Sequence, residues 1–226
     1  MKKKQETPQI KICGLTRVDQ ALKCVELGAD AIGLVFYPKS PRNITDMKAK
    51  EICIELPSKV SSVGVFVNES FEFIMDKVNR CHLKTVQLHG NESPALVRRL
   101  QNEDVKVIKL LYTENEPSTI NAKDYDASAY IVECDKGILP GGNAMSWNWG
   151  KAKEFGKAFP FILAGGLSLE NIKEAVTTAI PDAVDVSSGV EFEPGRKDIE
   201  KVRAFIKAVS QIEIPIENKR NLRVIF

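Results

Sequence analysis

The stretch Ala129–Asp135, which reads Ala-Tyr-Ile-Val-Glu-Cys-Asp, has the alternation of a β-strand whose two faces differ. Successive side chains of a strand point to opposite sides. Tyr130 and Val132 therefore share an apolar face, whereas Glu133 and Asp135 share the opposite face. A strand of this kind is expected to separate a hydrophobic core from a polar pocket, because carboxylates are costly to bury without partners.

Three further stretches repeat this pattern of one apolar and one polar face. The polar positions are Lys11 and Cys13 in Gln9–Cys13, Gln87 and His89 in Thr85–His89, and Asp185 and Ser187 in Ala183–Ser187. Because an unpaired polar group is costly to bury, we expect the four polar faces to converge on one solvated site. The fold that the sequence encodes should therefore bring these strands together.

Eight strand-like runs can be recognised along the chain: Gln9–Cys13, Ala31–Phe36, Ser62–Val67, Thr85–His89, Val105–Leu111, Ala129–Cys134, Phe159–Ala164 and Ala183–Ser187. Between most of them, apolar residues recur with helical spacing. This alternation predicts an α/β fold, a single-domain (β/α)8 TIM barrel, with a doubly wound open sheet as the alternative. We favour the barrel because polar strand faces can converge inside it, whereas helices would cover most of them in an open sheet.

Local signals predict where several elements begin and end. Thr16 and Asp19 resemble a capping box, Ser168 is placed to cap a helix that begins near Leu169, and Gly28 is a plausible helix end. The helix expected over Ser118–Tyr125 is weak. We expect the barrel to span residues 9–210, preceded by an extension over residues 1–8 and followed by a charged tail over residues 211–226 that the pattern does not place.

The composition narrows the class of protein. Of 226 residues, 43% are hydrophobic, which is enough for a core, and 32 basic residues nearly balance 30 acidic ones. We therefore expect neither a nucleic-acid-binding nor a membrane-binding surface. The five cysteines are scattered and predict neither a disulfide framework nor a metal site, which fits a cytoplasmic protein. The chain begins without the apolar stretch of a signal peptide, and no apolar run approaches the roughly 20 residues of a membrane span.

Two glycine- and serine-rich segments follow the last two predicted strands. Gly165-Gly166-Leu167-Ser168 follows the seventh strand, and Ser187-Ser188-Gly189-Val190-Glu191 follows the eighth. Glycine allows close approach of a ligand to the backbone, and free N–H groups at a helix start bind anions. Each segment alone is also typical of an ordinary turn. Their position at strands seven and eight indicates a phosphate site, because that is where barrels frequently bind phosphate.

Three residues at predicted strand ends or in the adjoining loops carry groups suited to proton transfer or anion binding. Cys13 is either an inert buried residue or, beside the ammonium of Lys11, a thiol with a lowered pKa. His89 is either structural or in contact with a ligand. Arg42 lies in the proline-flanked loop Pro38–Arg42, where its planar fork is solvated or pairs with a carboxylate. A thiolate and a carboxylic acid on opposite walls of a pocket would indicate proton-transfer chemistry.

Five motifs in order resemble the phosphoribosylanthranilate isomerase family of tryptophan biosynthesis. They are Lys11–Thr16, Gly64–Asn68, Val86–Gly90, Ala164–Leu167 and Asp185–Glu191. The resemblance runs from about residue 11 to about residue 209 and implies a (β/α)8 barrel without a cofactor. It implies an Amadori rearrangement of N-(5'-phosphoribosyl)anthranilate, in which an acid opens the ribose ring and a base removes the proton from C2'.

The resemblance also implies a role for each matching residue. Cys13 would be the base, and Arg42 would pair with the anthranilate carboxylate. His89 and Asp185 would line the pocket. The phosphate would be held by Gly166, Ser187, Ser188 and Gly189. The substrate would be a phosphorylated small molecule, and the protein would be a monomer or a homodimer.

The acid is where the sequence departs from the family, which ends strand six with aspartate. Alignment by the strand places Glu133 at that position, and alignment by the following loop places Asp135 there. Both residues have the required parity, and we favour Glu133 because it ends the apolar run. Ala144 replaces a usual glycine, and Trp147-Asn148-Trp149 replaces Phe-Asp-Trp. The family pattern therefore does not predict the shape of this loop.

Two other functions remain as alternatives. One is a sister phosphate-binding barrel, such as the isomerase of histidine biosynthesis or indole-glycerol-phosphate synthase. The isomerase of histidine biosynthesis ends strand one with an aspartate, where this chain has Cys13. Neither the catalytic lysine nor the longer N-terminal segment of indole-glycerol-phosphate synthase is evident in this sequence. The other is a non-catalytic barrel that binds a phosphorylated metabolite. The departures at Glu133 and Ala144 favour it, whereas Cys13, Arg42, His89 and Asp185 argue against it.

Overall fold

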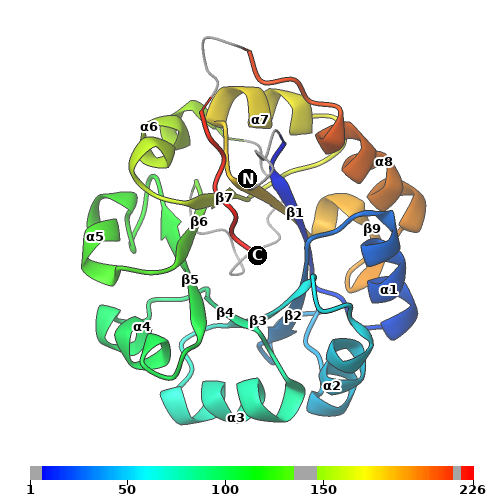
Figure 1. Ribbon diagram of the computed structural model, residues 1–226, viewed down its shortest axis with the longest axis vertical. Coiled ribbons are helices and arrows are strands. Elements are labelled where there is room, and N and C mark those ends of the chain that lie inside the picture. The colour runs from blue at the N-terminus through cyan, green and yellow to red at the C-terminus, as the bar shows by residue number, and fades with distance from the viewer. Residues whose placement is uncertain (1–6, 135–146, 216–219) are drawn as a thin grey trace.

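Parallel strands close into a barrel, as Figure 1 shows for the computed structural model. The structure describes residues 7–134, 147–215 and 220–226. Within these ranges, eight strands follow one another around the barrel in chain order, and the eighth pairs with the first in parallel, with Gln9 opposite Ala183 and Ile12 opposite Val186. Helices surround the barrel (Figure 1). The predicted single-domain (β/α)8 barrel is confirmed, and the open sheet is excluded.

The barrel strands are β1 (Gln9–Cys13), β2 (Ala31–Phe36), β3 (Ser61–Phe66), β4 (Thr85–Leu88), β5 (Lys106–Tyr112), β6 (Ala129–Glu133), β7 (Phe161–Leu163) and β8 (Ala183–Val186). The helices are α1 (Val18–Leu27), α2 (Asp46–Glu55), α3 (Phe71–Cys81), α4 (Pro94–Gln101), α5 (Ala122–Tyr125), α6 (Gly150–Ala158), α7 (Ile172–Ala179) and α8 (Ile199–Ser210). Two 3-10 turns, η1 (Thr119–Asn121) and η2 (Ser188–Val190), and a small hairpin of β9 (Glu191–Glu193) and β10 (Arg196–Lys197) complete the set.

The largest error in the predicted strand boundaries lies at β7. The expected strand began at Phe159, whereas β7 begins at Phe161. The backbone N–H of Phe159 donates to the carbonyl of Phe155, so this residue still caps α6. Pro160 follows and has no N–H to contribute to a strand ladder. An apolar run that spans a helix end and a strand start gives no signal of where one stops.

Two of the three predicted helix caps are wrong. The hydroxyl of Thr16 donates to the carbonyl of Gly195 at 2.9 Å, and α1 begins after Arg17 without a side-chain cap. Ser168 does not cap a helix at Leu169, because α7 begins at Ile172 after Asn171. Gly28 does end α1, with a φ of 113° that favours glycine. The weak helix is confirmed as the short η1 and α5 pair.

The two largest clusters of buried apolar residues lie between the strands and the helices and inside the barrel. Tyr130 and Val132 pack in the outer core, whereas Ile131 packs in the inner core. The alternation predicted for this strand is therefore confirmed. Because Glu133 has the same parity as Ile131, its carboxylate faces the barrel interior at the end of β6.

The C-terminal segment Arg220–Phe226 crosses the opening of the barrel at which β1 begins (Figure 1). Ile225 packs in the inner core, its N–H donates to the side chain of Gln9, and its carbonyl accepts from Lys106. Arg220 and Arg223 both pair with the fully buried carboxylate of Asp182. The tail, which the sequence pattern did not place, thus closes the end of the barrel away from the polar strand ends.

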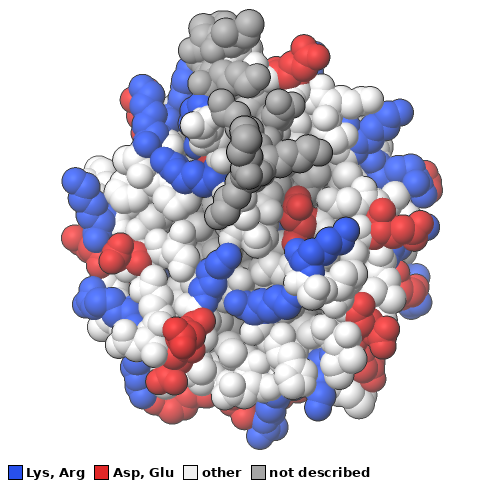
Figure 2. Space-filling view, viewed as in Figure 1, with Lys and Arg blue, Asp and Glu red and all other residues white. Residues whose placement is uncertain are grey.

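Charged side chains of both signs are interspersed over the face seen in Figure 2. This distribution fits the near balance of charges in the sequence. In the described part of the chain, no helix has the length and apolar character needed to span a membrane.

Candidate active site

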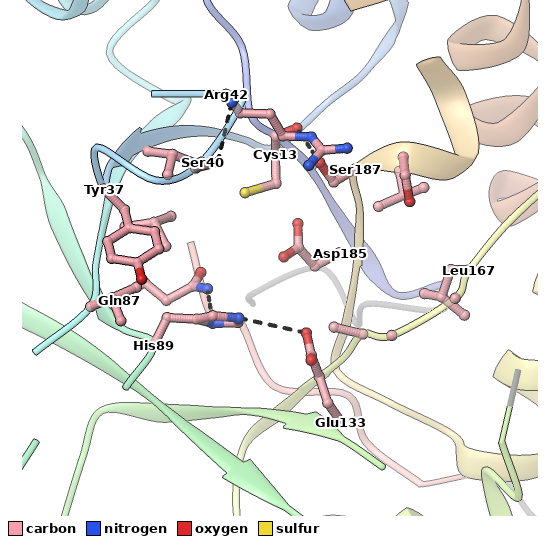
Figure 3. A pocket seen from close by; sticks show the side chains of 18 of the residues that line it. Cys13, Tyr37, Ser40, Arg42, Gln87, His89, Glu133, Leu167, Asp185 and Ser187 are labelled. Carbon is pink, nitrogen blue, oxygen red and sulfur yellow. Dashed lines mark hydrogen bonds and ion pairs between the residues drawn. The ribbon is translucent and has the colours of Figure 1, made fainter. Parts of the chain in front are cut away.

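A pocket lies at the C-terminal ends of the barrel strands. Its empty space is about 800 Å³, including open solvent. Figure 3 shows Cys13, Glu133 and Asp185 around it, from three different strands. The four polar strand faces that the sequence predicted do converge, because Gln87 and His89 from the β4 end and Ser187 from the β8 end also line the pocket.

Cys13 ends β1 and is largely buried, next to the ion pair of Lys11 and Asp185, whose Nζ and Oδ2 atoms are 2.8 Å apart. Burial is the largest influence and raises the pKa of the thiol, and the ammonium of Lys11 acts in the opposite direction. The expectation that Lys11 lowers the pKa of Cys13 overall is therefore wrong, because burial outweighs the ammonium. Gly33 lies opposite Cys13 in β2, and a Cβ there would be 2.6 Å from the sulfur.

Glu133 ends β6 and is also buried in the pocket wall. Burial, and then the nearby carboxylate of Asp185, raise the pKa of Glu133 to about 7. A carboxyl group with this pKa is partly protonated at neutral pH and can donate a proton to a substrate. Figure 3 shows Glu133 and Cys13 on opposite sides of the pocket, with Asp185 between them.

His89 faces Glu133, with its Nε2 atom 3.8 Å from a carboxylate oxygen (Figure 3). Burial lowers the pKa of His89 to about 3, with further contributions from Lys11 and Lys109, so the ring is neutral at physiological pH. The amide nitrogen of Gln87 lies 3.0 Å from Nδ1. Gln87 thus holds the His89 ring at Nδ1, and Nε2 faces Glu133.

Asp185 presents one free oxygen to the pocket. Its Oδ2 atom accepts from Lys11, whereas Oδ1 is buried and has no hydrogen-bond partner among the described residues. A buried oxygen without a partner is costly, and a ligand hydroxyl would satisfy it. The carboxylate of Asp185 is thus placed to accept a hydrogen bond from a bound polyol.

Arg42 lies in the loop after β2, at the mouth of the pocket. Its Nε and Nη2 atoms donate to the two carboxylate oxygens of Glu191, at 2.9 and 2.6 Å. Nη1 makes no hydrogen bond within the described residues. One edge of the guanidinium is therefore held by the protein, and the edge formed by Nη1 and Nη2 can still receive an anion.

The two glycine- and serine-rich segments lie side by side at the pocket. Gly166 has a φ of 70°, and Gly166, Ser187 and Ser188 line the pocket. Gly189 is not among the lining residues; a Cβ there would meet the carbonyl oxygen of Leu167 at 2.1 Å. Its lack of a side chain lets the two segments pack backbone against backbone.

Sequence reasoning missed several pocket residues and found one that lies outside the described residues. The apolar wall of Val35, Tyr37 and Val65 was not assigned to the site, although the parity of their strands could have indicated it. The contact of Glu191 with Arg42 joins residues 149 positions apart, and no local pattern predicts it. Asp135, the alternative acid, and the altered loop around Ala144 lie outside the described residues.

Comparison with known proteins decides the family. A family model described as N-(5'phosphoribosyl)anthranilate (PRA) isomerase matches residues 10–208. The chain belongs to this family. The resemblance inferred from the five motifs is thus confirmed, and the sister barrels are set aside.

Individual relatives of the isomerase family agree with this assignment. An N-(5'-phosphoribosyl)anthranilate isomerase from Desulfatibacillum aliphaticivorans is 49% identical over 212 residues, which cover 94% of this chain and 97% of that protein. The crystal structure of the isomerase from Thermotoga maritima superimposes with a TM-score of 0.84 at 40% identity and covers 91% of this chain and 100% of that one. A second crystal structure of a phosphoribosylanthranilate isomerase, with a TM-score of 0.80 at 39% identity and the same coverage, is a complex with reduced 1-(o-carboxyphenylamino)-1-deoxyribulose 5-phosphate.

Proposed function

We propose that Cys13 and Glu133 are the base and the acid with which this chain performs the reaction of its family. The chain is an isomerase of tryptophan biosynthesis that converts N-(5'-phosphoribosyl)anthranilate to 1-(o-carboxyphenylamino)-1-deoxyribulose 5-phosphate. The observation that carries the assignment is the pair itself: a buried thiol and a carboxyl group of pKa about 7 on opposite sides of one pocket. An ionised thiol can remove a proton and a protonated carboxyl group can donate one, which are the two proton transfers that the reaction needs.

The pocket supports one orientation of the substrate. The phosphate lies against Gly166, Ser187 and Ser188 and receives backbone N–H groups, and Gly189 keeps the two segments close. The anthranilate carboxylate pairs with the free edge of Arg42. The aromatic ring rests against the apolar wall formed with Tyr37. The ribose then lies between the two catalytic groups.

The reaction proceeds in three steps. Protonated Glu133 donates its proton to the ribose ring oxygen, the C1'–O4' bond breaks, and the nitrogen lone pair forms a protonated Schiff base at C1'. The thiolate of Cys13 removes the proton from C2', and the electrons of that C–H bond neutralise the Schiff base, which gives an enolamine. The enolamine then tautomerises: the C2' hydroxyl loses its proton, C1' gains one, and the product is a 1-amino-2-ketone.

Asp185 and His89 assist without exchanging a proton with the substrate. The free Oδ1 atom of Asp185 accepts a hydrogen bond from a ribose hydroxyl, which replaces the partner it lacks in the ligand-free pocket. Neutral His89 faces Glu133 with its Nε2 atom, close to the ring oxygen that Glu133 protonates. Together with the phosphate contacts, these contacts suit a phosphorylated small molecule as the substrate.

Substitution of Cys13 tests the assignment of the base. Cys13→Ala is expected to lower kcat by about 10²–10⁴-fold, because it removes a general base. The loss of anthranilate-type fluorescence of the substrate, generated in place, measures turnover. Cys134→Ala is the matched control, since that thiol lies beyond the end of β6 and outside the residues that line the pocket, and it should leave kcat unchanged. Full activity of a folded Cys13→Ala variant would remove the thiolate from the mechanism.

The compartment and oligomeric state remain part of the proposal. Five unclustered cysteines and a metabolic reaction suit the reducing cytoplasm. The active pocket is built from one chain, so a monomer or a homodimer can both be active.

A further inference from the structure

The hairpin of β9 and β10 follows the last barrel strand and carries two buried charges. Glu191 and Lys197 come from its two strands, and their side chains are 5% and 0% exposed. The Nζ atom of Lys197 lies 2.8 Å from Oε1 of Glu191. Burying this ion pair costs desolvation free energy, and a two-stranded hairpin does not by itself need a buried ion pair.

Glu191 is fully engaged by groups that converge on it. Besides Lys197, it accepts from Nε and Nη2 of Arg42 and from the backbone N–H of Gly195. Burial alone would raise the pKa of Glu191, but Arg42 and Lys197 outweigh it and hold the pKa below its usual value. The carboxylate therefore stays ionised and accepts from the Nε and Nη2 edge of the Arg42 guanidinium, so that the edge formed by Nη1 and Nη2 remains for a ligand.

Lys197 anchors this arrangement to the barrel. Its ammonium donates to the carbonyl of Ser187 at 3.1 Å, next to the segment that lines the phosphate end of the pocket. Its backbone exchanges two hydrogen bonds with the side chain of Gln20 in α1. Lys197 thus holds Glu191, which binds Arg42, and also contacts Ser187 at the phosphate end of the pocket.

The side chain of Arg42 passes close to the backbone of Gly14, and Glu191 fixes its guanidinium. A Cβ on Gly14 would be 2.5 Å from Cδ of Arg42, so the side chain crosses the backbone of Gly14 closely. Without Glu191, nothing else among the described residues accepts a hydrogen bond from the guanidinium. The long arginine side chain would then sample several rotamers, and ordering it would cost free energy when a ligand binds.

We propose that Glu191, fixed by Lys197, is a positioning residue that orients Arg42 toward the carboxylate of the substrate. This inference rests on the proposed role of Arg42 in the isomerase pocket. Glu191 itself does not touch the substrate in this account. It contributes affinity and selectivity for a ligand with an aromatic carboxylate by ordering the guanidinium in advance.

The test compares two ligands on three proteins. The ligands are reduced 1-(o-carboxyphenylamino)-1-deoxyribulose 5-phosphate and its analogue without the carboxylate, reduced 1-anilino-1-deoxyribulose 5-phosphate. The proteins are the wild type, Glu191→Gln and the control Glu193→Gln, which changes an exposed glutamate of the same hairpin. Titration calorimetry gives Kd for each pair, and the fluorescence assay gives kcat and KM.

The expected result is a loss of affinity that depends on the carboxylate. Glu191→Gln should weaken binding of the carboxylated ligand at least about tenfold, the size of one charge-assisted hydrogen bond, and raise KM more than it lowers kcat. Binding of the ligand without the carboxylate should change by less than about threefold. Glu193→Gln should match the wild type with both ligands.

Three results would overturn the proposal. They are equal losses with both ligands, no loss with either, or, in a separate comparison on an Arg42→Met background, a full additional loss when Glu191→Gln is added. If Glu191→Gln does not fold, Glu191→Asp keeps the charge beside Lys197 with a shorter reach, and it should show the same dependence on the carboxylate. Turnover by the wild type tests the isomerase function separately, so a failure of that function is distinguishable from a failure of this inference.

Discussion

Cys13 and Glu133 have pKa values in the reverse of the order that their roles require. The base must be deprotonated and the acid protonated, yet the pKa of Glu133 is about 7 and burial raises that of Cys13 above its usual value of 9.0. At any pH, therefore, only a minor fraction of the free enzyme carries both groups in the active form. The pH dependence of the reaction reveals this order.

We expect kcat/KM to rise with pH up to about 7, to stay level up to the pKa of Cys13, and to fall beyond it. Below pH 7 the thiolate fraction grows with pH while Glu133 stays protonated. Between the two pKa values, the gain in thiolate and the loss of protonated carboxyl cancel. The measurement is kcat/KM from pH 5 to 10, and an optimum that falls steeply just above pH 7 would contradict the reversed order.

Gly33→Ala tests how closely the sulfur must be placed. A methyl group at this position would meet Sγ of Cys13 at 2.6 Å, so the thiol must move. Because small displacements of a catalytic group cost about 10²-fold, we expect kcat to fall by roughly that factor in a folded protein. Gly64→Ala is the matched control, since its methyl group would meet Leu83 and Phe66 instead and should reduce stability but not kcat. Unchanged kcat in Gly33→Ala would show that the thiol position is not critical.

Strand alternation predicted most of the site, because parity is a local property of the chain. Glu133, Cys13, Gln87 and Asp185 were placed on the interior side by counting along single strands, and the structure agrees. The helix caps failed for the opposite reason. Thr16 has the sequence of a cap, but its hydroxyl bonds to a carbonyl 179 residues away, and such tertiary partners leave no local signal.

The segments after β7 and β8 act together through one glycine. Gly189→Ala would bring a methyl group to 2.1 Å from the carbonyl oxygen of Leu167, so the segments must separate. We expect the inhibition constant of inorganic phosphate and KM to rise at least about tenfold, the equivalent of one lost charge-assisted hydrogen bond. Binding of free anthranilate at the Arg42 end should change much less. A normal inhibition constant in the folded variant would contradict the joint phosphate site.

The tail is the part of the molecule that neither the sequence pattern nor the family match covers. The match ends at residue 208, whereas Arg220–Phe226 closes the barrel opening and pairs two arginines with buried Asp182. Its sequence has neither helical nor strand period, and its partners lie 38 or more residues away. Our division into an extension over residues 1–8, a barrel over residues 9–210 and a tail over residues 211–226 therefore stays a proposal.

Removal of residues 220–226 should destabilise the protein without stopping the reaction. It leaves Asp182 buried without its arginines and exposes the inner-core site of Ile225. Breaking a fully buried ion pair costs about 3–5 kcal/mol; because Arg220 and Arg223 are partly exposed, urea unfolding should show a loss at or below the lower end of that range. In the truncated protein, Asp182→Asn should restore part of the loss because it removes the unpaired charge. Equal stability of the full-length and truncated proteins would contradict a closing role for the tail.

The most direct test of the mechanism is turnover by the wild type, Glu133→Gln and Asp135→Asn, followed by the loss of substrate fluorescence. Glu133 lines the pocket, whereas Asp135 lies outside the described residues. We predict that the wild type is active, that Asp135→Asn retains most of its kcat, and that Glu133→Gln loses about 10²-fold or more. An active Glu133→Gln variant beside an inactive Asp135→Asn variant would contradict the assignment of the acid.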